Sequence, residues 1–288
     1  MSRVTARRRM RRITPAGEIT RPDSLAVEEP LEIRVNGQSL TVTMRTPGSD
    51  IDLVHGFLLA ENVIASADEV VSARYCAGTD DQGRNTYNVL DVQLRHAAAV
   101  PARKVLTTGA CGLCGRTALD QVHTSTAYPL TGTGPVVPPE VLAGLPETLR
   151  AEQSVFDATG GLHAAGLFTP AGGMVCVRED IGRHNAVDKV VGWALREHRV
   201  PLHDLLLVVS GRASFELVQK AVLAGIPLLA AVSAPSSLAV DLAVESGLTL
   251  VGFLRGETMN IYAGEHRVLA TDEQRREPLR TPTTRPAR

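Results

Sequence analysis

The 288-residue sequence has no long hydrophobic run and little cysteine. No apolar stretch approaches the roughly 20 residues of a membrane-spanning helix, so we expect no association with a membrane. Four cysteines are too few for a disulfide scaffold. The arginine-rich segment 7–12 is not followed by the apolar region of an export signal, so we expect a cytoplasmic protein with reduced thiols.

Common catalytic and metal-binding motifs are also missing. The eight histidines show neither H-x-x-x-H nor H-E-x-x-H spacing, and we predict no metal site. The sequence contains no G-x-x-x-x-G-K-[ST] phosphate loop, no G-x-S-x-G nucleophile elbow and no internal repeat. The function therefore has to be sought in less common patterns.

The net charge of −1 conceals an uneven distribution. Residues 1–24 carry seven arginines and two acidic residues, a net charge of +5, and residues 271–288 carry a net charge of +2. The intervening residues 25–270 therefore have a net charge of −8. Such an acidic body is a poor general nucleic-acid binder, because phosphate neutralisation requires a positive surface. We interpret both ends as disordered tails, the first basic and the second rich in proline and arginine.

The first half of the acidic body is predicted to be rich in β-strands. Residues 31–35 and 40–44 alternate between apolar and polar around Asn36 and Gly37, which is the pattern of a β-hairpin. A second alternating stretch, residues 87–94, predicts a further strand.

From about residue 160, short apolar strands alternate with helices. This alternation is typical of a parallel or mixed sheet covered by helices on both faces. The predicted elements, strand and helix by turns, are residues 174–177, 185–198, 205–209, 214–224, 228–232, 236–245 and 249–254. The predicted fold class is α/β, with a three-layer α/β/α domain and a smaller β-rich N-terminal part.

The predicted organisation has four parts. A proline- and glycine-rich stretch, residues 131–139, is the candidate linker between the two folded parts. We therefore expect a basic tail at 1–24, a β-rich part at 25–135, an α/β/α domain at 136–270 and a Pro/Arg tail at 271–288.

The most distinctive local feature is a glycine-rich segment, residues 109–116, that carries Cys111 and Cys114. Two thiols at this spacing can share a proton, stabilise one thiolate and close a disulfide, and Arg116 adds positive potential. Such a cysteine suits sulfur transfer, in which a thiolate accepts a terminal sulfur and passes it on. A structural zinc site is the alternative, although it needs four ligands and only one close pair is present. Cys176 lies within an apolar strand and is interpreted as a core residue.

Three further segments place arginine and glycine at predicted strand ends. Residues 178–189 fall at a strand-to-helix turn, where Arg183 and helix N–H groups could hold an anion. In the alternative interpretation, the polar residues of this segment are helix caps and solvated charges. Arg212 follows the next strand and Arg255 the last, so three forked guanidinium groups at one sheet edge would form a site for a polyanion. His163 is interpreted as a hydrogen-bonded core residue.

Together these segments resemble the formate dehydrogenase accessory sulfurtransferase family (the FdhD family). The stretches that carry the resemblance are GACGLCG at 109–115, TGGLHAA at 159–165, REDIGRHNAVDK at 178–189, SGRASFEL at 210–217, SAPSS at 233–237, FLRG at 253–256 and NIY at 260–262. They occur in the right order across most of residues 25–265. The family's larger domain is similar to the cytidine deaminase fold. This chain lacks the H-x-E and P-C-x-x-C zinc signature of the deaminases, so the resemblance implies that architecture without that chemistry.

The resemblance implies a sulfurtransferase with a cysteine persulfide intermediate. Such a protein would accept sulfur from a cysteine desulfurase and transfer it to the molybdenum of bis(molybdopterin guanine dinucleotide), before that cofactor enters formate dehydrogenase. Cys111 matches the sulfur-carrying cysteine of the family, and Cys114 matches its second cysteine. The cofactor contact of the family maps onto Phe253, Leu254, Arg255, Gly256, Glu257 and Thr258.

Two features are left open by the sequence. The alternative function is a non-catalytic chaperone that binds the molybdenum cofactor and delivers it. A symmetric homodimer is compatible with the sequence, although no residue requires one.

Overall fold

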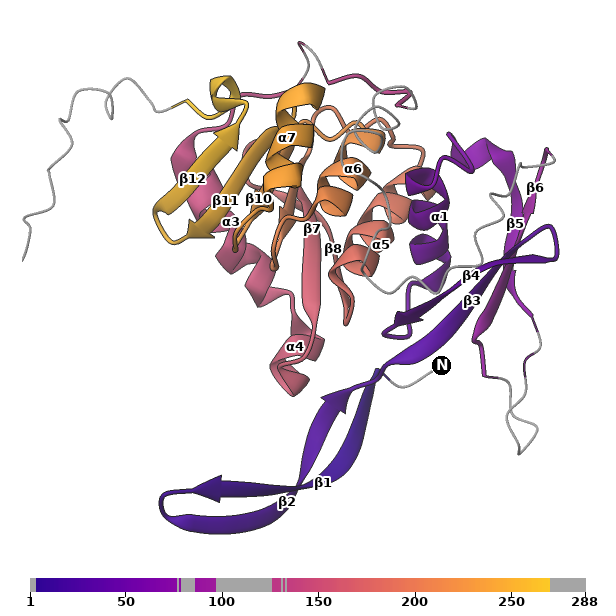
Figure 1. Cartoon of the computed structure of the whole chain (residues 1–288), viewed down its shortest axis with the longest axis vertical. Helices are drawn as coiled ribbons and strands as arrows, with labels where there is room; N and C mark the ends of the chain where they lie inside the picture. Colours follow the sequence, from indigo (N-terminus) through magenta and orange to yellow (C-terminus); the bar gives the residue numbers. More distant parts are fainter. Residues whose placement is uncertain are drawn as a thin grey trace, which may run out of the picture.

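The computed structural model of the chain describes residues 4–76, 78, 86–96, 126–130, 132 and 134–269. Within these residues the protein has a mixed α/β fold with a two-stranded, a four-stranded and a six-stranded sheet (Figure 1). No helix among them is long and apolar enough to span a membrane.

The six-stranded sheet has the strand order β12-β11-β10-β9-β7-β8. Four strands run in the same direction, namely β8 (Met174–Asp180), β9 (Leu206–Val209), β10 (Leu228–Ala231) and β11 (Thr249–Arg255). Two strands oppose them, β7 (His163–Phe168) and β12 (Thr258–Ala263). The four predicted strands are confirmed, whereas β7 and β12 were not predicted. The sequence of β7 is short and rich in small residues, and β12 is a polar edge strand, so neither shows a strong apolar run.

Helices cover both faces of this sheet, which confirms the three-layer arrangement (Figure 1). Neighbouring residues of β9 point to opposite faces of the sheet. Leu207 packs against the helices α5 and α6, and Leu206 packs against α3. The first face is covered by α5 (Arg183–Arg196), α6 (Phe215–Leu223) and α7 (Ser237–Ser246). The second is covered by α3 (Pro139–Ala151), with α4 (Ser154–Thr159) following it and a short 3-10 helix at Glu265–Arg267 closing the described chain.

The N-terminal part contains a four-stranded sheet with the order β4-β3-β6-β5. Its elements are β3 (Glu29–Val35), β4 (Gln38–Arg45), α1 (Asp50–Ala60), a 3-10 helix (Ala67–Glu69), β5 (Val70–Tyr75) and β6 (Val89–Leu94). The predicted hairpin is confirmed: Asn36 and Gly37 connect β3 to β4 with φ angles of 51° and 79°. Two left-handed residues in succession match the twist of the flanking strands.

The N-terminal part and the α/β/α unit share one continuous hydrophobic core. Leu53 and Leu58 of α1 belong to the same cluster as Val187 and Val191 of α5. The helices approach closely because glycines face each other: a Cβ on Gly192 would lie 1.8 Å from the carbonyl oxygen of Asp52. The predicted β-rich part therefore packs against the sheet's helical layer.

The expectation of a disordered N-terminal tail is wrong. The strands β1 (Thr5–Thr14) and β2 (Gly17–Ala26) pair antiparallel and form a hairpin that projects from the body (Figure 1). A run of arginines shows no apolar–polar alternation, so the sequence does not mark it as a strand. The run can still form one, because successive side chains point to opposite faces and the backbone hydrogen bonds between strands do not depend on side-chain charge. The second predicted tail, residues 271–288, lies outside the described residues.

Candidate functional site

The three predicted arginine-bearing loops lie at the same edge of the six-stranded sheet. Since β8, β9, β10 and β11 run in one direction, their carboxyl ends meet there. Arg183 begins α5 after β8, Arg212 follows β9, and Arg255 ends β11. Ligands of open α/β sheets bind outside such carboxyl ends. The juxtaposition expected from the sequence is thus confirmed.

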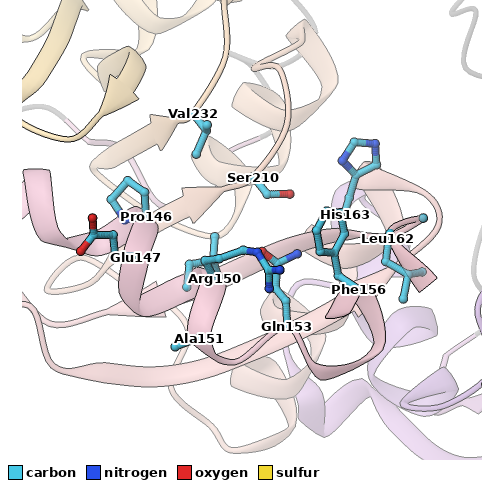
Figure 2. Close-up of a pocket in the computed structure, with 13 residues that line it drawn as sticks. Pro146, Glu147, Arg150, Ala151, Gln153, Phe156, Leu162, His163, Ser210 and Val232 are labelled. Atoms are coloured by element: carbon cyan, nitrogen blue, oxygen red, sulfur yellow. The ribbon is translucent and has the colours of Figure 1, made fainter. Parts of the chain in front are cut away.

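A cavity of about 820 Å³ opens at this edge (Figure 2). His163 at the start of β7, Ser210 after β9 and Val232 after β10 line its sheet side. Residues of α3 and α4 form the opposite wall, so the cavity lies between the sheet edge and the α3–α4 layer. Ser210 is held in place because its hydroxyl accepts a hydrogen bond from the N–H of Ala164, at 2.9 Å.

The α3–α4 wall combines a stacked cation with a buried amide. The Arg150 guanidinium lies 4.6 Å from the ring centroid of Phe156 and pairs with Asp157. Gln153 is only 3% exposed and lines the cavity. An amide in a cavity wall offers a ligand both a hydrogen-bond donor and an acceptor. No sequence motif marks this wall, and it was not predicted.

His163 lines the cavity and is only half-buried, so the expectation that it is a core residue is wrong. A Cβ added at Gly211 would lie 3.2 Å from Nδ1 of His163 and 3.8 Å from Cδ of Arg183. The loop after β9 therefore lies close to both His163 and Arg183. Burial, Arg183, His184 and Arg212 together lower the pKa of His163, and Asp180 opposes them. The site therefore presents a neutral imidazole beside guanidinium groups at neutral pH.

Most of segment 178–189 is structural. Nζ of Lys189 lies 2.7 Å from Oδ2 of Asp180 and donates to the carbonyl oxygen of Thr46 at 2.9 Å. Asp180 also accepts from the Thr46 N–H at 3.1 Å and from Nδ2 of Asn185 at 3.0 Å. All these groups are buried. They hold the chain between β4 and α1 against α5, so the alternative in which Lys189 is a solvated charge is wrong.

Further charged residues of α5 and α6 pair with each other. Asp188 and Lys220 form a buried pair at 2.7 Å, so Asp188 is likewise not a solvated charge. Nε2 of His184 lies 2.6 Å from Oε2 of Glu216. Nε of Arg183 is buried and has no hydrogen-bond partner among the described residues. Nε of Arg178 is in the same situation, but the other nitrogens of Arg178 donate to Asp52 and to the carbonyl oxygen of Val177. Of this segment, Arg183 is therefore the residue suited to an anion.

The predicted cofactor-contact stretch spans the end of β11, the turn at Gly256 and Glu257, and the first residue of β12. Nε of Arg255 donates to the carbonyl oxygen of Val232 at 3.1 Å, which ties this turn to a residue that lines the cavity. Phe253 is 39% exposed with a left-handed φ of 52°. Leu254 is a buried core residue, whereas the other five residues of the stretch are exposed. Those five can meet a ligand through their side chains or backbone, and Leu254 through its backbone only.

The cysteines divide into two groups. Cys111 and Cys114 lie outside the described residues. Cys176 is 6% exposed, and its burial raises the pKa of its thiol to about 11, which confirms it as a core residue. Among the described residues, no group of three or more His, Cys, Asp or Glu side chains is arranged to hold a metal ion.

Comparisons with known proteins agree with this architecture. The model of the FdhD/NarQ family matches residues 26–269. The sulfur carrier protein FdhD of Nocardia farcinica is 76% identical over 266 residues, covering 92% of this chain and 95% of the relative. The sulfur carrier protein FdhD of Streptomyces avermitilis is 60% identical over 273 residues, covering 93% of this chain and 97% of the relative.

One solved structure supports the fold. It is described as a formate dehydrogenase accessory protein from Desulfotalea psychrophila and superposes with a TM-score of 0.73 at 24% identity, covering 93% of this chain and 100% of that chain. The family match and the highly identical relatives together show that this chain belongs to the FdhD/NarQ family.

Proposed function

We propose that this protein is a cytoplasmic sulfur carrier that serves formate dehydrogenase. It accepts persulfide sulfur from a cysteine desulfurase on Cys111 and transfers that sulfur to the molybdenum of bis(molybdopterin guanine dinucleotide). The observation that carries the proposal is the cavity of about 820 Å³ at a sheet edge that also bears Arg183, Arg212 and Arg255. Its relatives in the family are named sulfur carrier proteins.

The chemistry of the edge suits this substrate. Each guanine dinucleotide carries phosphates, which forked guanidinium groups bind well. The planar heterocycles of the substrate would find a flat wall at the stacked Arg150 and Phe156, and hydrogen-bonding groups at Gln153. The phosphates also account for why three arginines gather on a body whose net charge is −8.

The proposed transfer involves two exchanges at sulfur. The Cys111 thiolate attacks the outer sulfur of the donor's persulfide, the donor S–S bond breaks, and the donor thiolate leaves with the electron pair. The Cys114 thiolate can then attack the inner sulfur of the Cys111 persulfide. This second step forms a Cys111–Cys114 disulfide and expels the outer sulfur as sulfide toward the metal.

Intact mass spectrometry tests the first exchange. The protein is incubated with a cysteine desulfurase and cysteine without reductant. We expect a gain of one sulfur atom that is lost on treatment with a thiol, is absent in Cys111→Ser and persists in Cys114→Ser. Because Cys114 can expel the sulfur again, the decisive protein is Cys114→Ser: no gain in folded Cys114→Ser beside an active desulfurase would contradict the carrier function.

Formate dehydrogenase activity separates the carrier from the chaperone. In a strain that lacks the native gene, the carrier function requires both Cys111 and Arg255, so Cys111→Ser and Arg255→Ala should each abolish most activity. A non-catalytic cofactor chaperone would lose activity only with Arg255→Ala. Full activity of Cys111→Ser would therefore favour the chaperone.

A further inference from the structure

The projecting N-terminal hairpin is unusually basic and lies almost wholly outside the region that the family model matches, residues 26–269. Its two strands span Thr5–Thr14 and Gly17–Ala26, and they contain six arginines and two acidic residues. The register places Arg7, Arg9 and Arg11 on one face and Arg8, Arg12 and Arg21 on the other. Both faces of the hairpin are therefore cationic.

The base of the hairpin contacts α4, but most of its residues are exposed. Ile13, Ile19 and Leu25 are 68%, 52% and 44% exposed. Of its six arginines, only Arg11 forms an ion pair within the described residues, with Glu18 at 3.3 Å. A two-stranded ribbon with no third strand is marginally stable in water, so a ribbon that keeps apolar side chains exposed is suited to a partner.

The hairpin is rooted at the rim of the cavity. Its last residue, Ala26, packs near Gly161, where an added Cβ would lie 3.8 Å from the Ala26 Cβ, and Gly161 lines the cavity. The hairpin runs past α4 (Figure 1). Farther out, a groove of about 420 Å³ is lined by four of the arginines together with Thr20 and Pro22. A protein that reaches the cavity mouth would therefore come within reach of this groove.

We propose that the hairpin is a docking arm for an acidic, partly apolar face of the enzyme that receives the substrate from the cavity. This inference rests on the proposed function, in which that enzyme is formate dehydrogenase without its cofactor. Carboxylates of the enzyme pair with Arg7, Arg9 and Arg11, and apolar side chains of the enzyme cover Ile13, which lies on the same face of the ribbon.

Two other occupants fit the observations less well. Nucleic acid would use the arginines, but it would leave the exposed isoleucines uncovered and would be repelled by the body, whose net charge is −8. A second copy could offer its acidic body to the arginines, but it would not account for an arm that is rooted at the rim of the substrate cavity. An interface that mixes arginine with apolar side chains is typical of a protein partner.

The test compares charge reversals on and off the arm. Arg7→Glu/Arg9→Glu changes the hairpin, and Arg74→Glu/Arg95→Glu makes the same charge change on the exposed side chains of the β5–β6 region. Isothermal titration calorimetry measures the affinity of each full-length variant for cofactor-free formate dehydrogenase. We expect the arm variant to bind roughly tenfold more weakly or worse, and the control to bind like wild type. Ile13→Ser, on the same face as Arg7 and Arg9, should also weaken binding without changing charge.

Three results would overturn the docking arm. They are unchanged affinity of the arm variant, an equal loss in the control, and no binding of the wild-type chain to cofactor-free enzyme. A loss that falls instead on self-association in light scattering, or on binding of a fluorescent oligonucleotide, would assign the hairpin to a second copy or to nucleic acid and also overturn it. Sulfur loading of Cys111 is measured in parallel on Cys114→Ser, so failure of the carrier function is recognised separately by absence of its sulfur adduct.

Discussion

Nζ of Lys189 on α5 lies 2.7 Å from Oδ2 of Asp180 at the end of β8, and both side chains are almost wholly shielded from solvent. Thr46, which precedes α1, supplies its N–H to the carboxylate and its carbonyl oxygen to the ammonium. The ion pair therefore joins the N-terminal part to the strand end that precedes Arg183. Lys189, in segment 178–189, therefore has a structural role: it holds in place the strand end that positions Arg183.

Breaking this pair should destabilise the fold strongly. Lys189→Met leaves the Asp180 carboxylate buried and uncompensated, so we expect the free energy of unfolding to fall by about 3–5 kcal/mol. Urea denaturation followed by circular dichroism measures the change. Arg34→Met removes an exposed partner of Glu32 and should have a much smaller effect. Equal losses in the two variants would contradict the structural role of the buried pair.

The contact between α1 and α5 should not tolerate a methyl group. A Cβ on Gly192 would lie 1.8 Å from the Asp52 carbonyl oxygen and 2.5 Å from the Gly56 nitrogen, so Gly192→Ala should cost about 3 kcal/mol or more. Gly144 is an exposed helical glycine of α3 with no atom within 4 Å of an added Cβ. Gly144→Ala should therefore raise stability by about 0.5–1 kcal/mol. Thermal and urea unfolding measure the stability change of each variant. If Gly192→Ala left the stability unchanged, α1 and α5 would have to move apart at little cost, and the close contact would not be required.

Anion binding at the cavity should strengthen as the pH falls. Burial and the nearby arginines lower the pKa of His163 from its ordinary value of 6.5, so its imidazole is neutral at pH 7 and becomes a cation only in more acidic solution. The added charge then lies beside Arg183 and Arg212 and favours a polyanion. Calorimetric affinities for guanosine diphosphate at about pH 7.5 and about pH 5.5 should differ more in wild type than in His163→Asn. Identical pH profiles of the two proteins would exclude His163 as the source of the pH dependence of anion binding.

Cys176 should be inert in the folded protein. Its thiol has a pKa raised to about 11 by burial, so only about one thiol in a thousand is ionised at pH 8. Iodoacetamide treatment of the native protein, followed by peptide mass mapping, should leave Cys176 unmodified, while the same treatment in denaturant labels it. Rapid labelling of native Cys176 at a rate comparable to half-buried Cys76 would show that the core opens there.

The elements that the sequence predicts well are those with local causes. Asn36 and Gly37 determine their own turn, because few residue pairs adopt two left-handed conformations in succession. The strands β9 and β10 are short apolar runs bounded by turns. Arg183, Arg212 and Arg255 could be assigned to one edge because strands joined by helices in one sheet run parallel. Each of these predictions needs only neighbouring residues or a general rule of topology.

The elements that it predicts poorly depend on distant partners. The polarity of residues 178–189 gives no indication that Asp188 and Lys189 are buried, because Lys220 and Thr46 satisfy them from 32 and 143 residues away. The α3–α4 wall of the cavity likewise has no motif, because Gln153 and Phe156 gain their role only from lying opposite His163 and Ser210.

The sequence by itself determined the family, the α/β alternation and the arginines at the strand ends, because these depend on residue identity and short-range pattern. Only the tertiary structure decided which charged side chains are buried as a brace and which face the cavity. It also decided that the basic N-terminal segment forms a paired ribbon. The physical reason is that the free energy of a charge depends on its surroundings, and chain folding brings those surroundings from far along the sequence.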